Sequence, residues 1–278
     1  MKGHTYVSNP VDADGFVQWN DTENETWAKL VARQAEIIKG KASDQFMEGL
    51  RILDFPKDKV PQIPDINTKL DECTGWGVAP VPALIQPKEF FTLLSNKRFP
   101  AATFIRIPEE MDYLQEPDIF HEVYGHTPLL TNQAYADFMQ KFGELALKAD
   151  PKDRRRLFRL FWFTIEFGLL KTEDGFKAYG GGILSSIGET QYAVSNDNEK
   201  VRFDVLEALR TPYRIDIMQP LYFYLNDFDE LFTILDQDVL SLLNKSKELG
   251  DYEPKFPPKE KAKASIDDVD DSMGSMGC

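Results

Sequence analysis

Two histidines with a carboxylate between them are the residues of this sequence that are best suited to chemistry. His121 and His126 stand five positions apart, and Glu122 directly follows the first. In the zinc-protease pattern H-E-x-x-H, the histidines are four positions apart and lie about 40° from each other on one helix face. A spacing of five puts them about 140° apart on an unbroken helix, so one metal ion could not bind both. The pair therefore predicts either a metal site at a helix end or two histidines that are hydrogen-bonded there without a metal.

A third ligand would make the metal site more specific, and Glu166 is the best candidate. Asp118 and Glu122 are closer in sequence, but the short separation limits their reach. Glu166 lies in the apolar run 160–170, where a carboxylate is costly to bury unless it is paired or bound to a metal. Two histidines and one carboxylate leave coordination positions open, as in non-haem Fe(II) sites that react with oxygen. The alternative is solvent exposure or an ion pair with a nearby arginine: Arg154, Arg155, Arg156 or Arg159.

The histidine pair requires a short helix that ends between its members. Pro117 suits the first position of such a helix, because its missing N–H would have no partner there in any case. Gly125 can adopt the left-handed conformation that ends a helix, and Pro128 prevents the helix from resuming. We therefore predict a helix over 117–124 that carries the first histidine in its last turn, with the second in the loop beyond.

Helical periodicity dominates the rest of the chain. The predicted helices are 22–38, 43–53, 88–96, 133–148, 153–170, 201–209 and 227–249. The predicted strands are 101–107, 175–179 and 214–221, and 56–64 is predicted to be a connector. This balance favours a mostly α fold with small β elements.

The composition excludes several classes of protein. With 278 residues and 42% hydrophobic side chains, the chain can bury a substantial core. A net charge of −14 repels phosphate and anionic lipid, so we expect no nucleic acid and no membrane as partner. Two cysteines, Cys73 and Cys278, allow no disulfide framework and no four-cysteine zinc site, and they favour a cytoplasmic location. We predict an N-terminal extension at 1–20, a catalytic domain at 21–253 and a disordered acidic tail at 254–278.

Four motifs of the chain, in this order, resemble one protein family. They are P-D-x-x-H-E-x-x-G-H at Pro117–His126, W-F-T-x-E-F-G-L at Trp162–Leu169, K-A-Y-G-x-G-x-L-S-S-x-G-E at Lys177–Glu189 and Q-P-L-Y at Gln219–Tyr222. The set resembles the pterin-dependent aromatic amino acid hydroxylases from about Trp19 to Tyr224 and, within that family, its bacterial phenylalanine-hydroxylating branch. The resemblance implies the single-domain catalytic fold of the family, with Fe(II) and a tetrahydropterin as cofactors.

The resemblance also implies roles for individual residues of this chain. The implied metal ligands are His121, His126 and Glu166. The implied substrate-binding residues are Arg106, Trp162, Phe167, Gly182 and Ser185. The implied cofactor-binding residues are Phe90, Glu122 and Phe161. Two further residues, Asp118 and Glu189, are implied to support the ligands.

Some of these roles have a stated chemical reason. Arg106 would bind the carboxylate of the amino acid, for which a guanidinium fork is well suited. Phe90 would stack on the pterin, and Glu122 would lie between the pterin and an iron-bound water. Glu122 and Ser185 are the two residues for which the resemblance implies a catalytic role. Glu189 would be the kind of partner that orients a metal-bound imidazole.

Several of these residues also have a purely structural interpretation. Ordinary core packing is the alternative for three aromatic residues: Phe90, Trp162 and Phe167. An ion pair with a neighbouring acid, Glu109 or Glu110, is the alternative for Arg106.

Two positions bear on the substrate. Trp162 resembles the phenylalanine and tyrosine branches of the family, and Ile215 is aliphatic as in the phenylalanine branch. Leu114 and Phe161 depart from the threonine and tyrosine of the animal enzymes, which leaves their contacts open. The resemblance thus implies a phenylalanine 4-monooxygenase that converts L-phenylalanine to L-tyrosine with O₂, and we expect a monomer or weak dimer. The alternatives are a tyrosine or tryptophan hydroxylase, a zinc hydrolase with Glu122 as its base, and a non-catalytic protein that binds aromatic amino acids.

Overall fold

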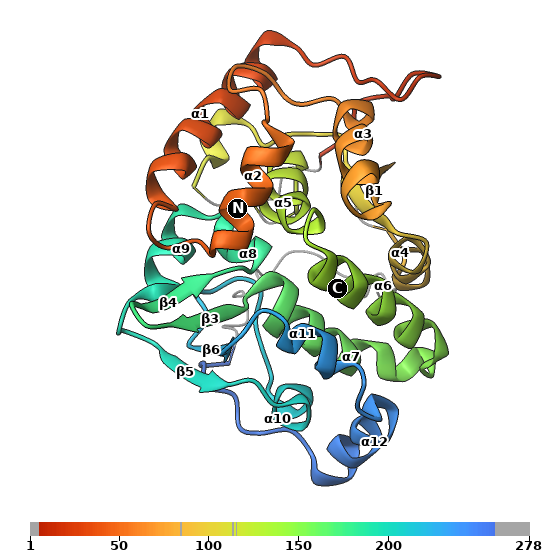
Figure 1. The fold of residues 1–278 in the computed structure, drawn as a ribbon, viewed down its shortest axis with the longest axis vertical. Helices are drawn as coiled ribbons and strands as arrows, with labels where there is room; N and C mark the ends of the chain where they lie inside the picture. The colour runs from red at the N-terminus through yellow and green to blue at the C-terminus, as the bar shows by residue number, and fades with distance from the viewer. Residues whose placement is uncertain (1–5, 84, 113, 115, 259–278) are drawn as a thin grey trace, which may run out of the picture.

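The fold is built mainly from helices, with two small sheets among them (Figure 1). A computed structural model describes residues 6–258, apart from residues 84, 113 and 115. The predicted mostly α fold with small β elements is confirmed. Most of the tail predicted at 254–278 lies outside the described residues, and the domain boundaries at residues 20 and 253 stay predictions.

The N-terminal part of the chain forms three helices, two of which were predicted. These helices are α1 (Asp21–Ile37), α2 (Asp44–Leu53) and α3 (Ile63–Thr74). α1 begins with a capping box, in which Asn20 and Glu23 each accept the other's backbone N–H, and this satisfies two donors that the first turn leaves free. The Ser43 hydroxyl caps α2 by accepting the backbone N–H of Phe46. α3 begins inside the predicted connector.

Two further predicted helices, α4 (Pro87–Ser95) and α6 (Gln133–Lys148), pack tightly against each other. Gly143 of α6 allows this, because a Cβ atom there would lie 2.6 Å from the backbone nitrogen of Ser95. The remaining α-helices are α5 (Thr127–Leu130), α7 (Arg154–Phe161), α8 (Gly181–Leu184), α9 (Ile187–Val194), α10 (Val205–Arg210), α11 (Glu230–Ile234) and α12 (Val239–Leu249). Within the described residues, two 3₁₀ turns (Pro108–Glu110 and Pro151–Asp153) and two π-helices (Phe120–His126 and Trp162–Glu166) complete the helical elements.

The larger sheet has the strand order β4-β3-β6-β5 and lies beside α8 and α9 (Figure 1). Its strands are β3 (Leu169–Thr172), β4 (Gly175–Ala178), β5 (Glu199–Arg202) and β6 (Leu221–Leu225). β3 and β4 form an antiparallel hairpin, whereas β3 and β5 both run parallel to β6. A second, parallel pair joins β1 (Gly77–Val81) to β2 (Arg98–Ala102). Because β3 starts three residues after Glu166, the larger sheet anchors the chain directly behind that residue.

Several predicted elements differ from the structure. In the first two cases below, strand pairing overrides the local helical periodicity. The helix predicted over 153–170 stops at Glu166, and the chain then enters β3. The helix predicted over 201–209 begins only at Val205, because 199–202 pair with β6 instead. The strand predicted over 214–221 is a loop up to residue 220. Two smaller differences are the break of the helix predicted over 227–249 into α11 and α12, and the end of the strand predicted over 101–107 at Ala102.

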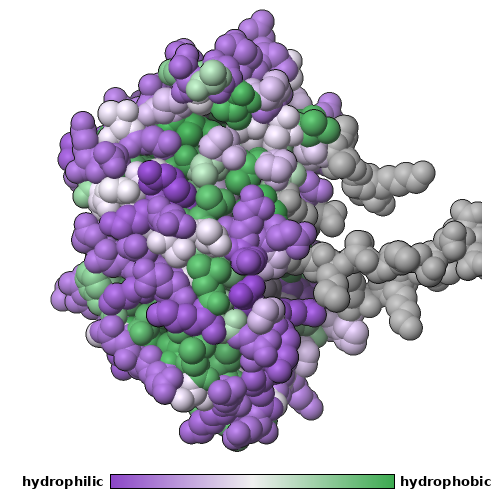
Figure 2. All heavy atoms as spheres, turned by 90° about the vertical axis from the view of Figure 1, so that its right-hand side faces the viewer, coloured by the Kyte–Doolittle hydropathy of each residue, from purple (hydrophilic) through white to green (hydrophobic). Residues whose placement is uncertain are grey.

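The surface is polar on the face shown in Figure 2, where hydrophilic side chains surround small apolar areas. Among the described residues, no helix is both long and apolar enough to cross a bilayer. The apolar side chains gather in one contiguous core that includes Trp27, Phe46, Phe120 and Phe142. Phe120, which stacks on Tyr124 within this core, directly precedes the first of the two histidines.

Candidate metal centre

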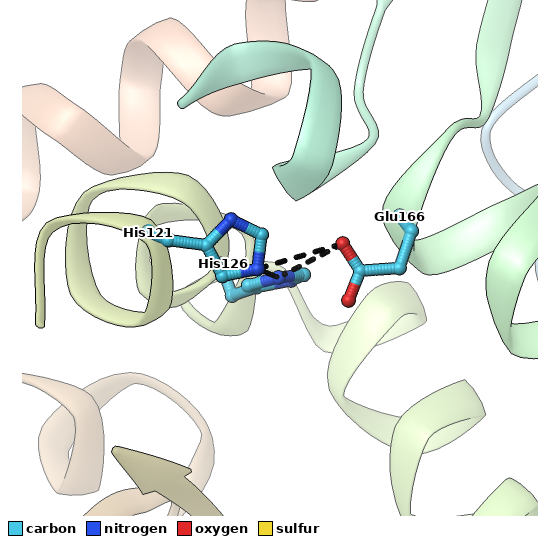
Figure 3. Close-up of side chains that lie close together, drawn as sticks. All are labelled: His121, His126 and Glu166. Carbon is cyan, nitrogen blue, oxygen red and sulfur yellow. Dashed lines mark hydrogen bonds and ion pairs between the residues drawn. The ribbon is translucent and has the colours of Figure 1, made fainter. Parts of the chain in front are cut away.

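The side chains of His121, His126 and Glu166 converge on one point (Figure 3). The two Nε2 atoms are 3.3 Å apart. Glu166 Oε2 lies 3.7 Å from His121 Nε2 and 3.4 Å from His126 Nε2. A circle through these three atoms has a radius of about 2.0 Å, which is close to the length of metal bonds to imidazole and carboxylate. Two imidazole nitrogens and one carboxylate oxygen around such a point are donors that fit a divalent iron.

A π-helix, and not a helix end, brings the two histidines together. Phe120–His126 is π-helical and continues directly into α5. In a π-helix the hydrogen bonds join residues five positions apart, so two residues at this spacing face the same side. The predicted helix end at Gly125 was therefore wrong, and Pro128 lies inside α5. Gly125 serves a different purpose, because a Cβ atom there would lie 2.8 Å from the carbonyl oxygen of Gly181.

Glu166 also comes from a π-helical segment, at the end of Trp162–Glu166. Its carboxylate accepts the backbone N–H of Gly182. The predicted alternative of an ion pair with an arginine does not occur for Arg156 or Arg159, which both bind Asp251. A Cβ atom on Gly182 would lie 2.9 Å from Glu166 Oε2, so the absence of a side chain at this position leaves room for the carboxylate.

Ser185 determines which nitrogen of the His121 ring carries the hydrogen. The Ser185 hydroxyl donates to the carbonyl oxygen of Gly181 at 2.8 Å and lies 2.9 Å from His121 Nδ1. A hydroxyl has one hydrogen, so Ser185 must accept from His121 Nδ1–H. The lone pair of the neutral ring is then on Nε2, which faces His126 and Glu166. Ser185 is therefore the residue that orients a ligand imidazole.

The protonation states of His121 and Glu166 suit metal binding. Burial lowers the pKa of His121 to about 4, so this ring is neutral at pH 7. Burial raises the pKa of Glu166, but the adjacent His126 ring and the Gly182 N–H outweigh it and hold the pKa below its ordinary value. The site therefore presents a neutral imidazole and a carboxylate that need no proton removed before they bind a metal.

Arg106 and Asp118 form a buried ion pair beside the metal ligands. The Arg106 Nε and Nη2 atoms donate to Asp118 at 2.8 and 2.9 Å. Asp118 also accepts the backbone N–H groups of Arg106 and His121. The carboxylate thus joins the implied substrate arginine to the helix that carries the first histidine. Arg106 therefore pairs with Asp118, and not with Glu109 or Glu110 as the alternative from the sequence predicted.

Aromatic rings surround Trp162, a residue implied to form the substrate pocket. The Trp162 ring lies 4.4 Å from Phe167 and 4.3 Å from Tyr213, measured between ring centroids. The indole N–H donates to the side chain of Gln219. Neither Tyr213 nor Gln219 was predicted to belong to this site, although Gln219 opens the Q-P-L-Y motif.

A second aromatic group contains two residues implied to bind the pterin. Phe90 of α4 lies 5.4 Å from Phe161, again between centroids, and both contact Phe158. Phe161 is buried, whereas Phe90 is partly exposed. Phe161 directly precedes the π-helix that ends in Glu166, so this group lies next to the metal ligands along the chain. Phe90 is the member of the pair that a ligand could reach.

The two remaining implied acids differ in their surroundings. Burial, followed by the nearby carboxylates of Glu166 and Asp118, raises the pKa of Glu122 well above its ordinary value. The described hydrogen bonds of Glu189 do not include an imidazole. Glu189 accepts instead from the backbone N–H of Gln219 and the hydroxyl of Tyr222. A described hydrogen bond to a ligand imidazole is instead formed by Ser185.

The residues implied to decide the substrate lie near the surface. Ile215 is 51% exposed, and Met218 of the same loop is 43% exposed. Leu114 is partly exposed between the undescribed residues 113 and 115. A cavity of 340 Å³ lies elsewhere, between β5, β6 and the segment 252–256. It holds none of the implied site residues.

Comparisons with known proteins agree with this geometry. The sequence model of the biopterin-dependent aromatic amino acid hydroxylase family matches residues 10–254. A curated relative, the phenylalanine-4-hydroxylase of Pseudomonas aeruginosa, is 49% identical over 94% of this chain and 100% of its own length.

Solved structures also resemble the chain, with TM-scores of 0.80 and 0.89 for the two described here. The apo structure of the cold-active phenylalanine hydroxylase from Colwellia psychrerythraea has a TM-score of 0.89 and 50% identity, over 92% of this chain and 100% of that one. The iron- and phenylalanine-bound phenylalanine hydroxylase from Chromobacterium violaceum has a TM-score of 0.80 and 37% identity, over 87% of this chain and 91% of that one.

Proposed function

This chain belongs to the biopterin-dependent aromatic amino acid hydroxylase family, and from that membership we propose that it is a phenylalanine 4-monooxygenase. It converts L-phenylalanine to L-tyrosine with O₂ and a reduced tetrahydropterin. The observation that carries this conclusion is the convergence of His121, His126 and Glu166 on one point at metal-bond distance. The curated relatives and the solved structures with this fold support phenylalanine as the substrate.

His121, His126 and Glu166 would hold the iron. When bound, Fe(II) and the reduced pterin supply the activation of O₂. Three protein ligands would leave further coordination positions of the iron free. Ser185 holds the His121 ring with Nε2 toward the metal, and Gly182 leaves space for the Glu166 carboxylate and donates to it.

The substrate would lie between Arg106 and the rings around Trp162. Asp118 uses the Nε and Nη2 atoms of Arg106, which leaves Nη1 for the carboxylate of the amino acid. Trp162 and Phe167 are buried and offer apolar surface to the phenylalanine ring. Charge pairing at one end and aromatic packing at the other would hold a zwitterionic aromatic amino acid in one orientation.

The pterin would stack on Phe90, which Phe161 supports from behind. Glu122 follows His121 directly in the π-helix and carries a raised pKa. Its carboxyl group therefore takes up a proton more readily than a free glutamate does, and it can hold that proton beside the pterin. These roles for Phe90, Phe161 and Glu122 are proposals that rest on the family membership and on the contacts above.

One experiment tests the function against its alternatives. Metal-depleted protein is incubated with phenylalanine, a tetrahydropterin and O₂, with Fe(II), with Zn²⁺ or with no metal, and tyrosine is measured. Tyrosine that forms only with Fe(II) and pterin supports the proposal. Hydrolytic activity with zinc alone would support a zinc hydrolase, and phenylalanine binding without oxygen uptake would support a binding protein. Parallel reactions with tyrosine and tryptophan test the other hydroxylase branches.

Three further expectations complete the proposal. We place the chain in the cytoplasm and expect a monomer or weak dimer, which sedimentation velocity measures directly. We also expect residues 21–253 to form the catalytic domain. Val17 lies before residue 21 but is buried. A truncated protein that tests the boundary at residue 21 should therefore be compared with one that keeps Val17.

A further inference from the structure

Gln219 lies at a buried junction behind the substrate pocket, in the loop between α10 and β6. Its side chain is 2% exposed. The Nε2 atom donates to the carbonyl oxygens of Arg214 and Ile217, at 2.8 and 3.0 Å. The Oε1 atom accepts the indole N–H of Trp162 at 3.2 Å. Each polar atom of this amide therefore has a partner, which is the condition for burying it without loss.

The orientation of the amide follows from these partners. Both carbonyl oxygens need a donor, so the NH₂ group must face Arg214 and Ile217 and the oxygen must face Trp162. The two bonds from Nε2 close the loop 214–219 on itself. The third bond ties this closed loop to the indole of Trp162.

The backbone of Gln219 is held as firmly as its side chain. Its N–H donates to Glu189 of α9 at 3.1 Å, and the same carboxylate oxygen accepts the hydroxyl of Tyr222 in β6. Gln219 thus connects α9, β6 and the π-helix Trp162–Glu166. Through that π-helix it reaches the wall of the pocket and, four residues later, the ligand Glu166.

The hydrogen bond from Gln219 decides how the indole of Trp162 lies. Trp162 contacts Phe167 and Tyr213 through its ring, and such contacts alone allow the ring to turn or slide. A buried indole N–H needs an acceptor, and Gln219 supplies it from one direction. Tyr213 and Ile215 lie in or beside the loop that the same amide closes.

We propose that Gln219 is a positioning residue for substrate binding in this enzyme. It fixes the plane of Trp162 and the shape of the loop 214–219 as one unit, and so it sets the fit of the phenylalanine ring. The inference rests on the proposed function, because it takes Trp162 as the wall of the substrate pocket. It assigns Gln219 no contact with substrate, iron or pterin.

The test compares Gln219→Leu with Gln191→Leu, a matched control on the exposed surface of α9. We expect Gln219→Leu to raise the KM for phenylalanine by about tenfold, as the loss of buried hydrogen bonds implies. The KM for the pterin and the iron content should stay within about twofold of the wild type, because this amide touches neither site. The control should leave all three quantities unchanged. Equal rises in both KM values would contradict a specific role for Gln219 in the phenylalanine pocket.

A Trp162→Phe background shows whether Gln219 acts through the indole. Phenylalanine has no ring N–H, so adding Gln219→Leu to Trp162→Phe should change the KM for phenylalanine much less than it does in the wild type. Additive effects of the two substitutions would overturn the proposal. If Gln219→Leu does not fold, Gln219→Glu replaces it in the same cycle. Glutamate keeps the size and an acceptor oxygen but has no NH₂ for Arg214 and Ile217, and we expect it to raise the same KM.

Nuclear magnetic resonance separates this inference from the proposed function. The four tryptophans give four indole N–H signals, and Trp162→Phe identifies the signal of Trp162. Gln219→Leu should shift that signal while the other three stay in place, whether or not the protein forms tyrosine. An unchanged Trp162 signal would refute the positioning role. Absence of tyrosine from the iron-loaded wild type would refute the proposed function instead.

Discussion

Ser185 Oγ lies 2.9 Å from His121 Nδ1 and can only accept from it, because its own hydrogen goes to Gly181. One hydroxyl therefore decides which nitrogen of the first histidine faces Glu166. This relationship ties the glycine-rich motif at Lys177–Glu189 to the histidine motif at Pro117–His126. It also yields the first of five predictions.

Replacing Ser185 with alanine should weaken iron binding without unfolding the protein. The His121 ring would lose the partner that fixes its tautomer, and such losses reduce metal affinity by about 10- to 100-fold. Competition with a chromogenic iron chelator measures this affinity. Ser95→Ala, whose hydroxyl forms an exposed hydrogen bond to Thr92 at the end of α4, is the control, and equal affinities of both variants would contradict the orienting role.

Glu166→Gln should abolish iron binding and tyrosine formation and leave the thermal midpoint nearly unchanged. The amide has the same size as the carboxylate, but it lacks the charge that a divalent cation needs. Iron content after gel filtration and tyrosine yield are the measurements, with the exposed Glu173→Gln as the control. Wild-type turnover by Glu166→Gln would remove Glu166 from the ligand set.

Gly182→Ala should lower iron affinity because its Cβ atom would lie 2.9 Å from Glu166 Oε2 and 3.0 Å from the Phe167 ring. We expect a loss of about tenfold as the carboxylate shifts from its bonding position. Gly188→Ala is a close control, since its Cβ atom would meet only Met218, at an ordinary 3.6 Å. If both alanine variants bound iron like the wild type, the space beside Glu166 would not matter.

Asp118→Asn should destabilise the protein by about 3 to 5 kcal/mol, because the charge of Arg106 would then be buried without its partner. The comparison is Asp112→Asn, which removes the exposed partner of Arg33 and should cost less than about 1 kcal/mol. Denaturant unfolding measures both values. Similar small losses in the two variants would show that the burial of the Arg106–Asp118 pair carries no energetic consequence.

The metal-free protein should lose stability as the pH falls below about 6.5. The pKa of His121 is lowered to about 4 by burial, so the unfolded chain binds a proton there at a higher pH than the folded chain does. The stability that the neutral ring contributes is present above the unfolded pKa and is lost as the pH falls toward the folded one. The loss is about 3 kcal/mol between these limits. The lowered pKa of Asp118 adds to it in the same direction at more acidic pH.

Unfolding curves of metal-free protein at pH 7, 5.5 and 4 test this dependence. His121→Gln should make the free energy of unfolding depend less on pH between pH 7 and 4, because the titrating ring is gone. If the free energy of unfolding of this variant changed with pH as steeply as that of the wild type, the pH dependence would come from other groups.

Much of the site could be predicted from residue types and their order along the chain. The three ligands were identified because the two histidines stand close together and because a carboxylate in an apolar run is destabilising unless it is paired or bound to a metal. Helices such as α2 and α6 were predicted because each has a cap and an amphipathic period that act within a few residues. The Asn132 cap of α6 and the Ser43 cap of α2 are local interactions of this kind.

Only the tertiary structure decided how the ligands meet. The five-residue spacing of His121 and His126 is satisfied by a π-helix, which local propensity does not predict because its turns are stabilised by surrounding packing. The partner of the His121 ring was Ser185 and not Glu189, and Gln219 was found behind Trp162, since hydrogen bonds across 57 or 64 positions leave no periodic signal in a sequence. The sequence by itself thus determined which three side chains could form the metal site. The packing of distant segments determined their geometry.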